Sequence, residues 1–228
     1  MPFGKAQPMK YKSIILLAMC FVAGCTNPVN MYTADRYYHL GAEAETRGDL
    51  EKACMYFSRS YGNTLMGNAP PLARAHALYE YARVSGYLGR LAEAEKGFSE
   101  VIALLDKVPD DPTHLRAPTH SEHAKLLFAN KRFRESIPEF EKAVTNLDQL
   151  SVENSEPGNY AVFLDKYGTA LRAGQSADQA DIIAKRVAKI HLEHPNAPVS
   201  PDQHTYVLAD SIPAPSPLVT PLTNSVGK

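Results

Sequence analysis

Small and apolar residues recur at helical spacing from about Ala34 to His191, in a stretch rich in alanine, leucine, tyrosine, glutamate, lysine and arginine. Residues three and four positions apart lie on one face of a helix, so this spacing predicts helices. When the stretch is compared with itself, four similar segments align. Each one reads as a helix, a tight turn and a second helix. The sequence therefore predicts an all-α protein of about four helical hairpins.

Three positions carry the alignment: a small residue within the first helix, a second small residue after the turn, and a ring four residues later. The small residues let neighbouring helices approach closely, and each ring buries on the order of 150 Å² between successive hairpins. The positions are Gly41, Ala53 and Phe57; Ala82, Ala94 and Phe98; Ala124, Ser136 and Phe140; and Gly168, Ala180 and Ala184. The last position of each segment recurs after 41, 42 and 44 residues.

The turns and the linkers between segments differ in chemistry. The turn residues are, in order, Gly48, Gly89, Lys131 and Gln175. The linkers 67–71, 109–112 and 154–159 all contain proline, together with glycine and asparagine in the first and third and aspartate in the second, and these residues favour loops. Pro138 lies early in a predicted helix, where it removes one backbone hydrogen bond and is expected to bend the first turns.

This pattern resembles the tetratricopeptide repeat (TPR), which combines a small residue in its first helix with glycine near the turn and alanine and an aromatic residue in its second helix. The standard repeat has 34 residues, and the longer period here is similar to that of kinesin light chains. The resemblance implies an α-α superhelix, a TPR-like solenoid. Three features depart from the family pattern: the chain has no tryptophan, and Lys131 and Gln175 replace glycine. The alternative is a helical bundle without repeats, with coincidental glycine and alanine spacing.

The resemblance also implies that the first helix of each hairpin faces a groove that binds peptides or helices. The residues expected to contact a peptide there are Tyr38, Tyr79, Arg83, Tyr87, Lys125, Phe128 and Arg172, with Asp35, Glu45, His76, Ser121, Asp165 and Thr169 on the same faces. Tyrosine and arginine are enriched at binding hot spots, so the composition favours a mild preference for acidic ligands. The alternative is that these are solvated helix residues. The lysine and asparagine clamp with which some family members grip a C-terminal carboxylate is not reproduced.

The first 25 residues resemble a bacterial lipoprotein signal. Three lysines precede an apolar run over 14–22, and the run ends in the box Val22-Ala23-Gly24-Cys25. The run is too short to cross a bilayer. The resemblance implies cleavage before Cys25, with a diacylglycerol on its thiol and an acyl chain on its amino group. Because Thr26 follows, it also implies sorting to the outer membrane. The alternatives are a signal without lipid and an uncleaved anchor, and Met9 is a second candidate start.

These observations divide the chain into four parts: a signal peptide over 1–24, a lipidated tether over 25–33, a repeat domain over 34–193, and a tail over 194–228. Seven prolines fall between Pro195 and Pro221, with serine, threonine and asparagine among them. Such a composition cannot continue a helix and buries little surface, so the tail is expected to be disordered or extended.

Charge and motifs exclude some function classes. Without the signal, the chain has 21 basic and 25 acidic residues, a formal charge of −4, which disfavours nucleic acid as a partner. The sequence contains no nucleophile elbow, zinc-protease helix, phosphate loop or paired Cys-x-x-Cys motif, so we expect neither an enzyme nor a cofactor beyond the lipid. The histidines at 114, 120, 123, 191 and 194 lack acidic or thiol ligands at a familiar spacing. Cys54 is expected to be buried as a small apolar residue.

Together these features predict a lipoprotein that faces the periplasm from the outer membrane and acts as a scaffold or assembly factor through protein-protein contacts. Two alternatives remain at this stage. In the first, the chain is an obligate structural subunit of an envelope complex of the pilus or secretion type. In the second, which the spacing of the histidines favours less, it is a metal-binding accessory protein.

Overall fold

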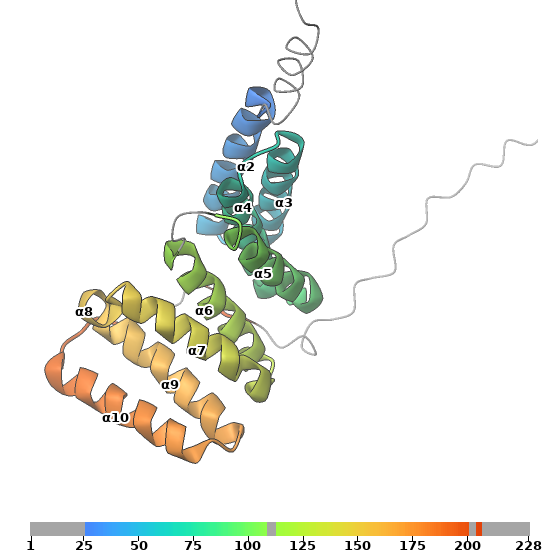
Figure 1. Cartoon of the computed structure of the whole chain (residues 1–228). Helices are drawn as coiled ribbons and strands as arrows, with labels where there is room; N and C mark the ends of the chain where they lie inside the picture. The colour runs from blue at the N-terminus through green and yellow to red at the C-terminus, as the bar shows by residue number, and fades with distance from the viewer. Residues whose placement is uncertain (1–25, 109–112, 201–203, 207–228) are drawn as a thin grey trace, which may run out of the picture. The chain divides into compact units, whose positions relative to one another are not determined.

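A computed structural model describes residues 26–108, 113–200 and 204–206, and in these ranges every regular element is a helix (Figure 1). The elements are α2 (Pro28–Thr46), α3 (Leu50–Met66), α4 (Pro71–Tyr87), α5 (Leu91–Leu105), α6 (Thr113–Ala129), α7 (Phe133–Gln149), α8 (Val152–Ser155), α9 (Pro157–Ala173) and α10 (Ala177–Glu193). The pairs α2/α3, α4/α5, α6/α7 and α9/α10 are the four expected hairpins. The all-α class is confirmed, whereas the signal segment and most of the tail lie outside the described residues.

The four hairpin turns share one backbone conformation. Gly48, Gly89, Lys131 and Gln175 have φ angles of 75°, 71°, 58° and 68°. In every case the next residue donates its amide to the carbonyl five positions earlier, as Arg132 does to Leu127 at 3.0 Å. This is the hydrogen bond of a Schellman helix end, which requires a left-handed residue. The alignment that placed Lys131 and Gln175 at the turn positions is therefore confirmed.

Helix α2 begins earlier than the sequence indicated. Residues 28–33, which we assigned to a tether, form its first turns. The Asn27 side chain accepts hydrogen bonds from the amides of Val29 at 3.0 Å and Asn30 at 3.3 Å, and Pro28 takes the first helical position. An asparagine cap followed by proline is a strong start signal for a helix, and it corrects the predicted boundary.

The predicted loop over 154–159 is also largely helical. The short helix α8 ends at Ser155, and α9 begins at Pro157. Proline has no amide hydrogen to leave unpaired and its φ is already helical, so it starts α9 as Pro71 starts α4. Prolines in linkers are expected to act as breakers, whereas Pro71 and Pro157 each also mark the first residue of a helix. The linker over 109–112 lies outside the described residues.

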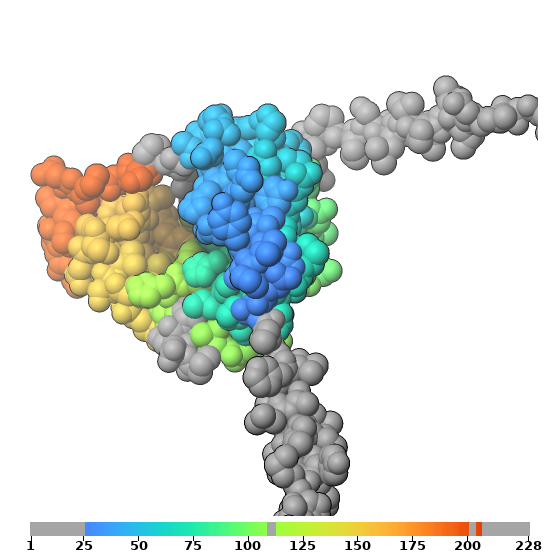
Figure 2. Space-filling view, turned by 90° about the horizontal axis from the view of Figure 1, so that it is seen from above, coloured from blue at the N-terminus to red at the C-terminus, as the bar shows by residue number. Residues whose placement is uncertain are grey.

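The helices divide into two compact units, whose boundaries fall inside α4, α5 and α6. The N-terminal unit comprises the described residues 26–84, 96–108 and 113–119. In its first hairpin α2 and α3 pack side by side, and their adjoining surfaces are the blue to light-blue part of Figure 2. The Phe57 ring lies against Gly41 so closely that an added Cβ would come within 2.7 Å of it. The small residue therefore has its predicted role of close helix approach, while this contact of the Phe57 ring lies within one hairpin rather than between successive hairpins.

The C-terminal unit comprises residues 85–95 and the described part of the chain from His120 onward. Phe140 lies at its centre, with ring centroids 5.1 Å from Phe163 and 5.4 Å from Tyr167. Ala180 is fully buried at the second small position, whereas Ala184, which replaces the ring, is only partly buried. The aromatic packing of this unit therefore comes from α6, α7 and α9 rather than α10.

No helix in the described ranges is long and apolar enough to cross a membrane. Cys54 is 2% exposed, which confirms its predicted burial.

Candidate functional site

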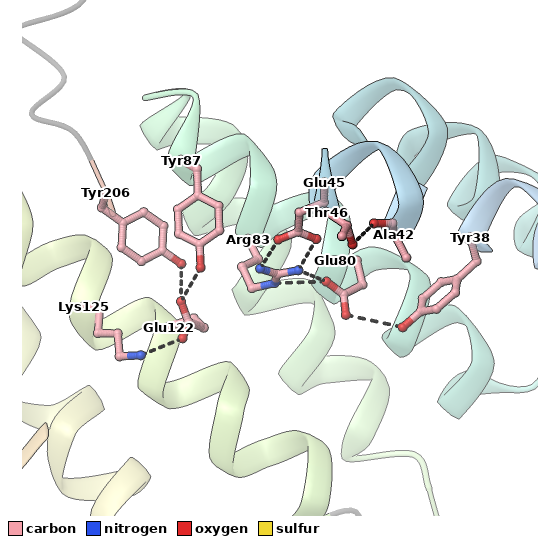
Figure 3. A network of polar contacts seen from close by, with 10 residues as sticks. All are labelled: Tyr38, Ala42, Glu45, Thr46, Glu80, Arg83, Tyr87, Glu122, Lys125 and Tyr206. Atoms are coloured by element: carbon pink, nitrogen blue, oxygen red, sulfur yellow. Dashed lines mark hydrogen bonds and ion pairs between the residues drawn. The ribbon is translucent and has the colours of Figure 1, made fainter. Parts of the chain in front are cut away.

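An arginine on α4 organises the polar face of the N-terminal unit. The Arg83 guanidinium binds Glu45 of α2 through two parallel contacts of 2.6 and 2.7 Å, and it binds Glu80 of its own helix at 2.5 and 3.0 Å (Figure 3). The three side chains are between 12 and 17% exposed. A two-pronged arginine–carboxylate contact fixes direction as well as charge, so Arg83 joins α2 to α4.

Tyr38 extends this cluster. Its hydroxyl donates to Glu80 at 3.3 Å, and burial together with that carboxylate raises the pKa of Tyr38 to about 12. Its ring meets Phe57 edge-on at 5.6 Å. Two of the expected groove residues, Tyr38 and Arg83, are thus engaged by acids of their own chain, and an acidic ligand at this place would have to compete with Glu45 and Glu80.

A second cluster lies in the C-terminal unit and centres on Glu122 of α6. The carboxylate accepts hydrogen bonds from Tyr206 at 2.7 Å and Tyr87 at 3.4 Å, and Lys125 binds its other oxygen at 2.9 Å (Figure 3). The two tyrosine rings are 4.7 Å apart. Only 12% of the Glu122 side chain is exposed. Tyr87 and Lys125, both expected in the groove, therefore meet at one acid, with a tyrosine of the tail as the third partner.

Two cavities open beside this cluster. One, of about 210 Å³, is lined by Tyr87, Glu122, Lys125, Phe128, Ala129 and Lys166 with residues 204–206 of the tail. The other, of about 550 Å³, is lined by residues that include Ser121, Lys125, Asn159, Phe163, Lys166 and Ser200. Both cavities share Lys125 and Lys166, and we call them together the C-terminal groove. Its walls combine aromatic rings, two cations and an amide, which suits a mixed ligand such as a peptide.

One wall of the groove is held rigidly by Tyr160 at the start of α9. Its hydroxyl donates to Asp148 of α7 at 2.7 Å, and burial and the Asp148 carboxylate raise the pKa of Tyr160. Arg186 of α10 binds the same carboxylate at 2.6 Å and lies 5.1 Å from the Tyr160 ring. Because α7, α9 and α10 meet at this network, the wall has a fixed position.

The other expected groove residues are placed differently. Tyr79 packs its ring toward Phe98 at 6.4 Å in the core of the N-terminal unit. Phe128 lines the smaller cavity and also contacts the Phe133 ring at 5.3 Å. Arg172 is exposed on α9 beside a separate hollow between α9 and α10. The structure therefore brings Tyr87, Lys125 and Phe128 together in the C-terminal groove, while Cys25 lies outside the described residues.

Two of the candidate metal-binding histidines contact one carboxylate instead. His120 and His123 contact the Glu139 carboxylate through Nδ1 at 2.7 and 3.4 Å, and Lys142 binds it at 2.8 Å. Burial by itself would raise the pKa of Glu139, but the hydrogen bonds from both histidines and the lysine lower that pKa well below its ordinary value. Within the described ranges, no three histidine, cysteine or acidic residues are arranged to hold a metal ion.

Four residues of the groove could not be predicted from the sequence. Glu122, Asn159 and Lys166 carry no motif, although Glu122 lies three residues before Lys125 and so had a visible ion-pair partner. Tyr206 lies in the tail, which was expected to be disordered or extended and to bury little surface. Only the folded chain brings it to Glu122.

Comparisons with known proteins support the fold. No family model and no curated protein matches the chain. Two crystal structures of a kinesin-light-chain-type protein of Podosopora anserina with nearly identical TPR-like repeats, one of them a single-substitution variant, align with TM-scores of 0.55 and 0.56. Identity is 18%, over 72% of this chain and 77% of theirs. MamA protein aligns at 14% identity over 74% of this chain and 98% of its own, with a TM-score of 0.42. The likeness to the two kinesin-light-chain-type structures, together with the four hairpins, shows that the chain has a TPR-like helical-repeat fold.

Proposed function

We propose that this protein is a non-enzymatic interaction scaffold that binds a segment of another protein in the C-terminal groove. The observation that carries the proposal is the groove itself, in which Lys125, Lys166 and Asn159 converge beside the Phe163 ring around a cavity of about 550 Å³. Aromatic surface supplies area for binding, and a few fixed polar groups set the orientation of the ligand. The TPR-like fold is consistent with such a role.

We further propose that the scaffold is tethered to the bacterial envelope through lipid on Cys25 and faces the periplasm from the outer membrane. The support is the sequence Val22-Ala23-Gly24-Cys25 after an apolar run, with Thr26 next. Each buried methylene of a lipid chain contributes about 0.8 kcal/mol and a single chain binds only marginally, so stable attachment needs the two or three chains of a lipoprotein. In that setting the partner is an envelope protein.

Site-specific photocrosslinking in living cells tests the groove. A photoreactive residue replaces Val162, which lines the larger cavity and is 37% exposed, and in a matched strain it replaces Lys185, which is exposed on α10. We expect a discrete set of crosslinked proteins from position 162 and none of them from position 185. Equal crosslinking from both positions, or no crosslink from position 162, contradicts the proposal.

The double substitution of Tyr79 and Arg83 by alanine would not serve this purpose. Tyr79 packs against the core of its unit, and Arg83 binds two carboxylates at low exposure. Loss of binding in that variant would reflect loss of stability, whereas a change at Val162 leaves both of these structural contacts intact.

A further inference from the structure

We propose that the tail of this chain is the resident ligand of the C-terminal groove, and that partners displace it by presenting the same chemistry. That chemistry is an extended, proline-containing segment with a tyrosine six residues after the point where its backbone is bound. The inference rests on the proposed function, because it names the class of segment that the groove accepts. The described tail residues 194–200 and 204–206 carry the argument.

The first contact binds backbone. The amide of Ser200 donates to Oδ1 of Asn159 at 2.8 Å, and Nδ2 of Asn159 lies 3.5 Å from the Ser200 hydroxyl. The same Nδ2 donates to Glu156 at 3.1 Å, which holds the amide in place. The Asn159 carbonyl oxygen accepts from a main-chain amide, a donor that every residue except proline offers, so this hydrogen bond recognises backbone rather than a particular side chain. The residues from Ala197 to Ser200 have no regular secondary structure, as such recognition requires.

The second contact binds a side chain. The Tyr206 hydroxyl donates to Glu122 at 2.7 Å, and its ring packs on Tyr87 at a centroid distance of 4.7 Å. His204 adds a second ring 5.5 Å from Tyr87. A charged acceptor for the hydroxyl and an aromatic surface for the ring select tyrosine over phenylalanine, since phenylalanine would leave Glu122 without this hydrogen bond.

Two helical glycines provide room for the tail. A Cβ at Gly86 in the last turn of α4 would come within 2.5 Å of the Tyr206 ring, and a Cβ at Gly158 in the first turn of α9 would overlap the Pro198 carbonyl. Glycine inside a helix is less favourable than alanine, so a helical glycine needs a reason. At Gly62 in α3 the space is empty. The contrast indicates that Gly86 and Gly158 admit the tail.

The tail is also covalently tethered next to its site. Only the residues after Glu193, the last of α10, separate the helical domain from the contact at Ser200. A short tether gives the tail a high effective concentration at the groove. A segment of another protein must therefore bind more tightly than the tail, or be present at a higher concentration, to displace it. The tail therefore sets an affinity threshold for partners.

A fluorescent peptide with the sequence of residues 195–206 is the probe, titrated by anisotropy against the full-length protein in detergent. We expect the Tyr206→Ala protein to bind this probe at least tenfold more tightly than the wild type, because its own tail competes less. Adding Gly158→Ala to Tyr206→Ala is expected to remove that gain, whereas adding Gly62→Ala is expected to preserve it. A probe in which the tyrosine is alanine is expected to bind at least tenfold more weakly.

Three results would overturn the assignment: equal probe affinity in the wild type and Tyr206→Ala, binding that ignores Gly158→Ala, or no binding by any variant. Self-association of the wild type that Tyr206→Ala abolishes, measured by sedimentation, would place the tail on a second copy and also refute it. The crosslinking experiment at position 162 is independent. If it captures partners while the peptide result fails, the scaffold function stands and the resident-ligand assignment falls.

Discussion

At the residue scale, backbone conformation at the four turns matters more than residue type. Glycine adopts a positive φ without steric cost, whereas lysine and glutamine adopt it only at a steric cost. Lys131 and Gln175 nevertheless hold the same conformation as Gly48 and Gly89. The packing of the hairpins on both sides therefore imposes the turn, and the unfavourable conformation is compensated elsewhere in the fold.

Lys131→Gly tests this compensation. The substitution is expected to raise the free energy of unfolding by about 1 kcal/mol, because glycine removes the left-handed penalty and Lys131 lies on an exposed turn. Urea denaturation measures the change. Lys96→Gly is the control: Lys96 lies in the exposed interior of α5, so the same replacement should cost about 1 kcal/mol. A loss of stability in both variants would contradict the argument.

The Glu139 cluster predicts how stability depends on pH. The pKa of Glu139 is lower in the folded protein than its ordinary value of about 4.5, so the unfolded chain takes up its proton first as pH falls. The contribution of Glu139 is therefore complete above about pH 4.5 and declines as the pH falls toward the folded pKa. Between pH 6 and pH 3, the free energy of unfolding measured in urea is expected to decline less in Glu139→Gln than in the wild type. If the two curves run parallel, the Glu139 cluster does not cause the pH dependence.

At the element scale, periodicity predicted the helices well and their starts poorly. The recurrence of small residues and rings located all four hairpins, because packing repeats with the helices that cause it. The start of α9 was missed because Pro157 was taken as a breaker, and the start of α2 because its first residues were assigned to the tether, although proline occupies the first position of both helices. Pairing between helices was not visible either, since Glu45 and Arg83 are 38 residues apart in the chain.

The link between α2 and α4 through Arg83 gives a prediction at this scale. Arg83→Met is expected to cost about 2 kcal/mol, because it leaves Glu45 and Glu80 at low exposure without their partner. Arg83→Lys should recover only part of the loss, since an ammonium cannot make the two-pronged contact. Arg47→Met, at an ion pair more than 60% exposed on both sides, is the control and should change stability little. Chemical denaturation distinguishes these variants, and equal losses at Arg83 and Arg47 would contradict the role of the link.

At the scale of the whole molecule, the sequence predicted the candidate site only in part. The family register placed Tyr87, Lys125 and Phe128 on helices that do line the C-terminal groove. It could not place Asn159 or Tyr206 there, because their contacts join α9 and α6 to residues 41 and 84 positions away. The described tail residues 194–200 and 204–206 contain no helix, in line with the composition, but composition could not show that such a segment packs on a folded surface.

The proposed lipid attachment gives a further prediction at the scale of the whole molecule. Cys25→Ser is expected to abolish incorporation of an alkyne-labelled fatty acid and to move the protein from the membrane fraction to the soluble one, because serine lacks the thiol that accepts the lipid. Cys54→Ser is the matched control: Cys54 is buried, and its replacement should leave labelling unchanged. Persistent labelling of Cys25→Ser would refute the proposed anchor.

The left-handed turns at Lys131 and Gln175 have a consequence for finding relatives of this chain. A profile that scores glycine at each turn penalises two of these four hairpins, although their geometry is the same. The buried small residues and rings are set by contact between helices and so tolerate fewer alternatives. Genome searches weighted toward those interior positions, with a period near 42, should recover distant homologues that glycine-based profiles overlook.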